Sequence, residues 1–207
     1  MYELSKRAFD LSAAALGLLL LAPLLALAAG AAWLGGLRPV LFRQLRTGYR
    51  EQPFYILKLC TMTQATDARG ELLPDAERLT SLGRLLRRSG LDELPQLWNV
   101  LRGELSLVGP RPFLHDYLPL YTAEQKRRFL VRPGITGWAQ VHGRNALSWD
   151  EKFTLDSWYV AHRSWALDVR ILGMTLRQLF SSRRPPGADA PATRFMGSTP
   201  PSPTPLA

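Results

Sequence analysis

Hydrophobic residues are concentrated in one run near the start of the chain. No charged residue occurs from Leu11 to Leu37. As one straight helix this run would be roughly 40 Å long, whereas the hydrocarbon core of a bilayer is about 30 Å thick. Hydropathy alone therefore favours a transmembrane anchor. The run is also longer than the hydrophobic region of a signal peptide.

Two features favour a segment that enters the membrane and returns to the same side. Pro23 lies at the middle of the run, where it removes a backbone hydrogen bond at a cost of about 3 kcal/mol in a helix interior. A break there leaves two arms of roughly 20 Å, each too short to span the bilayer. Positive charge flanks both ends of the run, whereas a spanning helix has its excess on one side. These flanking residues are Lys6 and Arg7 before the run, and Arg38, Arg43, Arg46 and Arg50 after it. We therefore predict a re-entrant helix–break–helix with both flanks in the cytoplasm.

The stretch from 38 to 180 has the mixed pattern of a globular domain. Apolar runs at 40–42 and 54–57, on either side of Thr47-Gly48, predict a β-hairpin. Helical periodicity predicts helices at 79–86, from Ser89 to Gly103, at 122–130 and over most of 149–180. In the last of these, aromatic residues alternate with cationic ones, which suits a helix in the headgroup layer or a Trp-rich helix packed on the core.

The predicted fold class is α+β, in three parts. Residues 1–37 form the re-entrant membrane helix, and residues 38–180 form a compact, mainly helical cytosolic domain with a small β-hairpin and interfacial amphipathic helices. Residues 181–207 are rich in Pro, Ser and Ala without apolar periodicity, which predicts a disordered tail.

The charge balance indicates anionic partners. The chain carries a formal net charge of +9, which fits nucleic acid, anionic lipid or a phosphorylated substrate. Together with the hydrophobic N-terminus this favours a membrane surface. A non-catalytic basic membrane-surface adaptor or a nucleic-acid-binding protein is the alternative, although we find no aromatic-basic motif of a nucleic-acid module. The single cysteine, Cys60, excludes an intrachain disulfide and a zinc site built from several cysteines.

The segment from Arg87 to Leu97 carries the strongest candidate chemistry. Taken alone, Ser89 followed by Asp92 is typical of a helix N-cap, which is a structural role. The same geometry also suits a reactive site, because carboxylates at a helix N-terminus stay ionised and phosphate oxygens are attracted there. Arg87 and Arg88 could neutralise a pyrophosphate. The adjacent carboxylates Asp92 and Glu93 favour Mg²⁺, and an ionised Asp92 could attack phosphorus.

Proline lies on both sides of Arg111, at Pro110 and Pro112. This restricts the backbone and fixes the direction of the guanidinium, either in a binding loop or in a rigid surface turn. Glycine-punctuated loops follow at 132–138 and 140–145. They expose backbone amides and an arginine.

Several motifs together resemble the small monotopic phosphoglycosyl transferases, the bacterial sugar transferases that start glycoconjugate assembly on undecaprenyl phosphate. The resemblance covers roughly residues 4–180 and is greatest to the Campylobacter PglC type. The motifs are Lys58 with Thr61-Met62, Glu71-Leu72-Leu73-Pro74-Asp75, Leu91-Asp92-Glu93-Leu94-Pro95-Gln96-Leu97, Gly109-Pro110-Arg111-Pro112, Pro133-Gly134-Ile135-Thr136-Gly137 and Gly143-Arg144-Asn145.

The resemblance implies an enzyme of the cytoplasmic membrane, monotopic, with Mg²⁺ at Asp92 and an active site facing the cytoplasm. Asp92 would attack a UDP-sugar, release UMP and pass the phosphosugar to undecaprenyl phosphate, with Glu93 orienting the metal or handling a proton. The residues implied to bind substrate are Lys58, Arg87, Arg88, Pro110, Arg111, Pro112, Arg144 and Asn145. Membrane lipids are further partners, nucleic acid is not expected, and the aromatic helices leave room for a homodimer.

Two positions depart from the family pattern. Cys60 stands where the family often has a basic residue, and Ala22 precedes Pro23 where the family often has serine. A degenerate member that has lost activity is a further reading, which the presence of Asp92, Glu93 and Arg111 disfavours.

Overall fold

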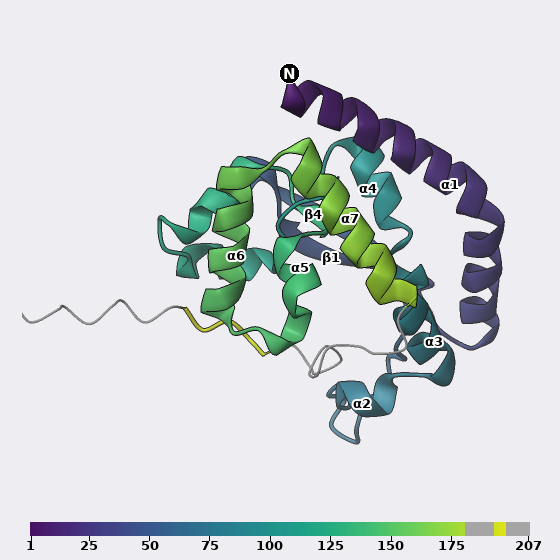
Figure 1. The fold of residues 1–207 in the computed structure, drawn as a ribbon. Coiled ribbons are helices and arrows are strands. Elements are labelled where there is room, and N and C mark those ends of the chain that lie inside the picture. The colour runs from purple at the N-terminus through teal and green to yellow at the C-terminus, as the bar shows by residue number, and fades with distance from the viewer. Residues whose placement is uncertain (181–192, 198–207) are drawn as a thin grey trace, which may run out of the picture.

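A computed structural model describes residues 1–180 and 193–197 (Figure 1). The chain folds into a mainly helical domain with two small sheets and one long N-terminal helix. The α-helices are α1 (Tyr2–Leu34), α2 (Asp75–Arg78), α3 (Ser81–Ser89), α4 (Gln96–Arg102), α5 (Trp138–His142), α6 (Trp149–His162) and α7 (Trp165–Phe180). The strands are β1 (Leu41–Thr47), β2 (Pro53–Leu59), β3 (Ser106–Val108) and β4 (Gly134–Thr136). Short 3₁₀ turns are η1 (Tyr49–Glu51), η2 (Leu91–Glu93), η3 (His115–Leu120), η4 (Gln125–Leu130) and η5 (Arg144–Ala146).

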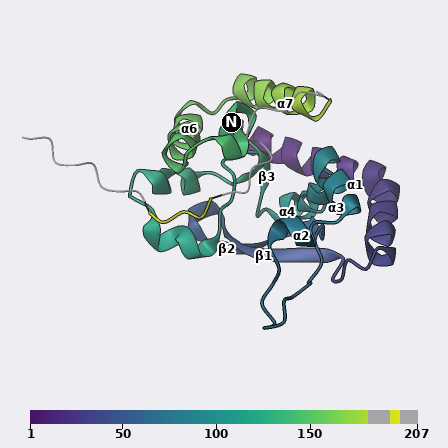
Figure 2. The same cartoon turned by 90° about the horizontal axis from the view of Figure 1, so that it is seen from below.

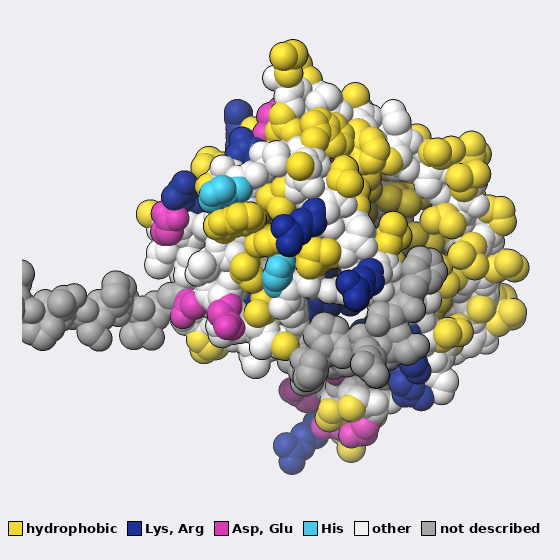
Figure 3. Space-filling view, in the orientation of Figure 1, with side chains coloured by type: hydrophobic (Ala, Val, Ile, Leu, Met, Phe, Trp, Pro, Cys, Tyr) yellow, Lys and Arg dark blue, Asp and Glu magenta, His cyan; other side chains and the backbone are white. Residues whose placement is uncertain are grey.

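Helix α1 contains Pro23 and continues on both sides of it. The ribbon bends partway along its length and turns down the side of the domain (Figure 1), and a proline inside a helix is a usual cause of such a kink. By length and composition, α1 is the one described helix that could cross a membrane. Its outer face is apolar, as Figure 3 shows at the right of the view. Exposed residues there include Leu16, Leu19, Leu20, Leu24 and Leu27.

Both ends of α1 are packed on the globular domain. Near its start, Lys6 Nζ lies 2.8 Å from Asp168 Oδ2 of α7, and the buried Asp10 accepts a hydrogen bond from the Leu107 amide at 3.2 Å. Near its end, Ala28 packs with Leu59 and Leu86. The domain therefore contacts α1 on both sides of the kink.

Strands β1 and β2 form the predicted hairpin, in antiparallel register from Leu41 opposite Leu59 to Thr47 opposite Pro53. The hairpin is longer than the apolar runs indicated, because polar positions such as Arg43 and Gln44 continue the ladder. Strands β3 and β4 pair in parallel. Figure 2 shows α7 on one side of the domain and the hairpin on the other.

The region around Ser89 differs from the prediction. Ser89 is the last residue of α3, and its hydroxyl donates to the Leu85 and Leu86 carbonyls. Gly90 ends that helix with a φ of 73°. Asp92 then lies in the 3₁₀ turn η2, before α4 begins at Gln96. The expectation that Ser89 caps a helix carrying Asp92 in its first turn is therefore wrong.

The other predicted helices are partly confirmed. Within the predicted helix 122–130, only Gln125–Leu130 is helical, and it forms the 3₁₀ turn η4 rather than an α-helix. The stretch 149–180 divides into α6 and α7. Of the aromatic residues in α6, Phe153 is buried, whereas Trp158 is 40% exposed and stacks on Trp138 with ring centroids 5.1 Å apart. The core-packing reading is confirmed for Phe153, and the headgroup-layer reading stays a prediction for the exposed Trp158.

Most of the predicted tail, at 181–192 and 198–207, lies outside the described residues. Within it, the stretch 193–197 is described, and the Phe195 side chain is buried in an aromatic cluster. The composition of the tail, from which disorder was predicted, gave no sign that Phe195 packs on the domain.

Candidate active site

The turn η2 places two adjacent carboxylates at the junction of α3, α4 and strand β2. Gly90 allows the chain to reverse after α3, because its left-handed conformation disfavours other residues. Asp92 is only 8% exposed. The side chain of Lys58 reaches this turn from β2.

Glu93 is bound by two cations from distant parts of the sequence. Its Oε1 atom lies 2.5 Å from Lys58 Nζ and 3.4 Å from Arg111 Nη2. Burial alone would raise the pKa of Glu93, but Arg111, Lys58 and Arg144 outweigh it and lower the pKa to about 2. Glu93 is therefore ionised at neutral pH. Burial lowers the pKa of Lys58, and the contact with Glu93 opposes that effect.

The pKa of Asp92 is shifted in the opposite direction. Burial, together with the neighbouring charge of Glu93, raises the pKa of Asp92 to about 6, while Lys58, Arg87 and Arg111 oppose the increase. The ion pairs of this turn engage Glu93 rather than Asp92. The site thus holds one firmly ionised carboxylate beside a second that is costly to ionise.

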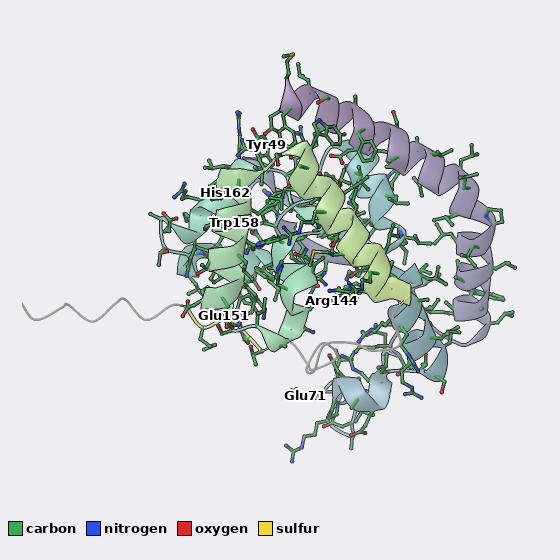
Figure 4. The ribbon with its side chains drawn as sticks, viewed as in Figure 1. Tyr49, Glu71, Arg144, Glu151, Trp158 and His162 are labelled. Carbon is green, nitrogen blue, oxygen red and sulfur yellow. The ribbon has the colours of Figure 1, made fainter. Side chains whose placement is uncertain are left out.

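The other predicted arginines are all exposed, and two of them, Arg87 and Arg144, act electrostatically on this pair. Arg87 Nε donates to Thr61 Oγ1 at 2.9 Å, which directs it toward the strand end beside Lys58. Arg144, labelled in Figure 4, follows α5 and contributes to the low pKa of Glu93. Arg88 and Asn145 are exposed, in α3 and η5 respectively.

Backbone packing holds the loop that carries Arg111. The Gly109 amide donates to Thr136 O, and the Gly134 amide donates to Pro110 O, each at 2.9 Å. A Cβ on Gly137 would lie 2.0 Å from Gly109 O, so the two loops meet backbone to backbone. Pro110 and Pro112 are buried and Arg111 is partly exposed. The binding-loop reading of Pro110-Arg111-Pro112 is therefore favoured over a surface turn.

Two arginines near this loop were not predicted as site residues. Arg46 in β1 lies near Arg111, and burial together with Arg111 lowers the pKa of Arg46 to about 10. Arg128 Nη2 donates to the Arg111 carbonyl at 2.5 Å and pairs with Asp156 at 2.8 Å. In the sequence, Arg128 belongs to a basic run that is typical of a solvated face, so no local signal marks it as buried.

Cys60, one of the two departures from the family pattern, is buried, and its thiol donates to Met62 O at 3.1 Å. It packs with Ala32 and Leu37 at the end of α1. The position is thus part of the contact between α1 and the domain.

The donor set around Asp92 fits a magnesium ion completed by substrate. No cluster of three or more His, Cys, Asp or Glu ligands occurs within residues 1–180 and 193–197. Mg²⁺ commonly uses one or two carboxylates together with substrate phosphates and water. The buried Asp92 lacks a close cationic partner in the ion pairs of this turn, so it is the residue that would hold the ion.

Comparison with known proteins identifies the family. The family model described as bacterial sugar transferase matches residues 1–182. The uncharacterized sugar transferase EpsL of Bacillus subtilis is 50% identical over 194 residues, covering 93% of this chain and 96% of that protein. The UDP-glucose:undecaprenyl-phosphate glucose-1-phosphate transferase of Caulobacter vibrioides is 48% identical over 151 residues, covering 68% of this chain and 55% of that protein. The undecaprenyl-phosphate glucose phosphotransferase of Komagataeibacter xylinus is 42% identical, covering 86% of this chain and 36% of that protein.

The chain belongs to the bacterial sugar transferase family. It is therefore an enzyme, which confirms the resemblance to the family, though not to its PglC type, and disfavours the adaptor reading. The chain spans almost all of EpsL but about half or less of the other two relatives. Together with the long apolar α1, the family points to membrane association.

We predict that Asp92→Asn stabilises the protein at pH 7.5. The folded-state pKa of Asp92, about 6, lies above the ordinary value of 3.8. Keeping this carboxylate ionised therefore costs stability, fully above pH 6 and progressively less as the pH falls toward 4. The amide removes a cost on the order of 2 kcal/mol. Thermal unfolding at pH 7.5 and pH 4.5 would measure it.

The matched control is Asp116→Asn, because Asp116 is exposed. It should change the melting temperature little at either pH. A destabilised Asp92→Asn at pH 7.5, or a gain that grows toward acid pH, would contradict the electrostatic state assigned to Asp92.

Proposed function

We propose that this enzyme transfers a sugar-1-phosphate from a UDP-sugar to undecaprenyl phosphate. The proposal rests on the pair of unlike carboxylates, Asp92 and Glu93, within a group of cations. It is supported by relatives whose names state transfer of glucose-, galactose- or N-acetylgalactosamine phosphate to undecaprenyl phosphate. The excess of positive charge around the turn suits a diphosphate donor.

In the first step, a carboxylate oxygen of Asp92 attacks the β-phosphorus of the UDP-sugar. The bond from that phosphorus to the oxygen bridging the two phosphates breaks, and UMP leaves with the bonding electrons. The phosphosugar remains on Asp92 as an acyl phosphate. In the second step, an oxygen of undecaprenyl phosphate attacks the same phosphorus. This step releases the Asp92 carboxylate and forms undecaprenyl-diphosphate-sugar.

The neighbouring side chains have distinct roles in this proposal. Glu93 stays ionised and holds Lys58 and Arg111 in place, rather than handling a proton. Arg111, partly exposed, would bind the donor phosphates. Arg87 would offset part of the negative charge of Asp92. When bound, Mg²⁺ would supply additional positive charge for the diphosphate, with Asp92 as its protein ligand.

The lipid acceptor can reach this site along apolar side chains. Leu179 of α7 would contact a Cβ placed on Gly90, two residues before Asp92, at 3.4 Å. Leu176, Leu179 and, in α3, Leu85 are exposed. An apolar edge beside the reacting carboxylate suits a substrate that has a polyprenyl tail.

We predict that Asp92→Asn reduces UMP release by about 10³-fold or more, since the amide is not a nucleophile. The assay uses the purified full chain with undecaprenyl phosphate, Mg²⁺ and a panel of UDP-glucose, UDP-galactose and UDP-N-acetylgalactosamine. Asp116→Asn should retain wild-type turnover. Near-normal turnover by Asp92→Asn would exclude Asp92 as the nucleophile. A wild-type enzyme that releases no UMP from any donor would contradict the proposed reaction.

We also propose that α1 is re-entrant, with its two ends on the cytoplasmic side. The support is that the same domain contacts Lys6 and Asp10 before the kink and Ala28 after it. A straight transmembrane helix would place its ends on opposite sides of the bilayer and would lose one set of these contacts.

The topology predicts that Glu3→Cys and Arg50→Cys have the same accessibility. Both positions should react with a membrane-impermeant maleimide in inverted vesicles and be protected in intact spheroplasts. The native Cys60 is buried and serves as the unreactive background. Labelling of the two positions from opposite sides would show that α1 spans the membrane.

A further inference from the structure

The short stretch 193–197 returns to the domain after α7. Phe195 is only 2% exposed, although the adjacent Met196 is 79% exposed. Figure 1 shows this stretch against the start of α6. A single buried ring between exposed neighbours is typical of an anchor residue, because only that side chain gains from the contact.

Phe195 completes a box of aromatic rings. Its ring centroid lies 5.1 Å from Trp149, 5.2 Å from Phe153, 5.6 Å from Tyr121 and 5.7 Å from Tyr117. Burial of the ring and its four aromatic contacts favour the docked stretch, whereas ordering the backbone of five residues opposes docking. Because Phe195 is the one buried side chain within 193–197, the docking of this stretch depends on its ring.

Two rings of the box also hold Arg128. Its guanidinium carbon lies 5.4 Å from the Phe153 ring centroid and 5.8 Å from that of Tyr121, and 4.2 Å from that of Phe113. The same guanidinium pairs with Asp156 and donates to the backbone carbonyl of Arg111. The aromatic box therefore connects Phe195 with the loop that carries Arg111.

The hydrogen bonds of Arg128 do not by themselves fix its guanidinium, so its position also depends on the surrounding rings. Among the described residues, the buried Arg128 Nη1 and Asp156 Oδ1 atoms have no hydrogen-bond partner. The ion pair therefore lacks the second, parallel hydrogen bond that would fix its geometry. Loss of a wall of the box would allow the guanidinium to move or admit water.

We propose that Phe195 is a positioning residue for the sugar-phosphate transfer. It closes the aromatic box, which holds Arg128, and Arg128 in turn holds the Arg111 carbonyl so that the Arg111 side chain reaches Glu93. This inference rests on the proposed function for its effect on turnover, whereas its effect on the Arg111 loop is independent of the reaction.

The test compares three variants of the full chain: Phe195→Ala, which empties the box; Phe195→Leu, which refills most of it; and Met196→Ala, a matched exposed neighbour. Hydrogen exchange reads the order of residues 111–121 and of the Thr47 amide, which donates to Phe113 O at 3.2 Å. We expect faster exchange in Phe195→Ala, near-wild-type exchange in Phe195→Leu, and no change in Met196→Ala.

Steady-state UMP release supplies the second readout. Phe195→Ala should lower kcat/KM for the UDP-sugar about tenfold, and Phe195→Leu should restore most of it. Because Phe195 acts through Arg128, the effects of Phe195→Ala and Arg128→Lys should be strongly non-additive in the double variant. Simple additivity would mean that Phe195 stabilises the domain without positioning Arg111.

The outcomes separate this inference from the proposed function. Wild-type exchange in Phe195→Ala would overturn the inference even if the enzyme is fully active. If the wild-type enzyme releases no UMP, the proposed reaction fails, while hydrogen exchange still decides whether Phe195 orders the Arg111 loop. If Phe195→Ala does not fold, a tenfold loss of kcat/KM in Phe195→Leu at wild-type exchange would contradict the inference, because the loss would then not come from the Arg111 loop.

Discussion

The ion pairs of Glu93 are the interaction on which the site depends. One carboxylate oxygen is shared by Lys58 of the hairpin and Arg111 of the loop after β3. This contact joins three segments that are far apart in the sequence, and it occupies the cations that would otherwise pair with Asp92. A buried carboxylate that loses such partners is expensive to ionise. The raised pKa of Asp92 therefore follows first from its burial and then from the charge of Glu93, and the nearby cations only partly offset it.

The same arrangement explains why the site can be both ordered and reactive. Glu93 and the cations around it contribute structure, whereas Asp92 contributes a destabilising charge, which neighbouring anions increase and cations offset. In our proposal, Mg²⁺ associated with the donor would offset this charge, because Lys58 and Arg111 form their ion pairs with Glu93 and not with Asp92. The packing of α1 on both sides of its kink and the exposed leucines of α7 place this chemistry at an apolar boundary.

The sequence predicted the parts of the fold whose signals are local. The hairpin follows from two short apolar runs on either side of Thr47-Gly48, and the kinked apolar helix follows from Pro23. Most of the site could be assigned because the motifs around Asp92 and Arg111 resemble those of a known family. By contrast, a serine followed three residues later by an aspartate, as at Ser89 and Asp92, can occur at the start of a helix or at its end. The left-handed turn at Gly90, fixed by packing, decides between them. The role of Arg128 depends on Asp156, 28 residues away, and the burial of Phe195 depends on rings from η3 and α6. No local pattern reports such contacts.

The most direct test of this account is the chemical state of Asp92 during turnover. The purified enzyme would be mixed with a UDP-sugar and Mg²⁺ in the absence of undecaprenyl phosphate, quenched in cold acid, digested and analysed by mass spectrometry. The account predicts a phosphosugar adduct on Asp92, in a peptide that also contains the unmodified Glu93, and its disappearance when undecaprenyl phosphate is added before the quench. An adduct on Glu93 instead, or UMP release without any adduct, would contradict it.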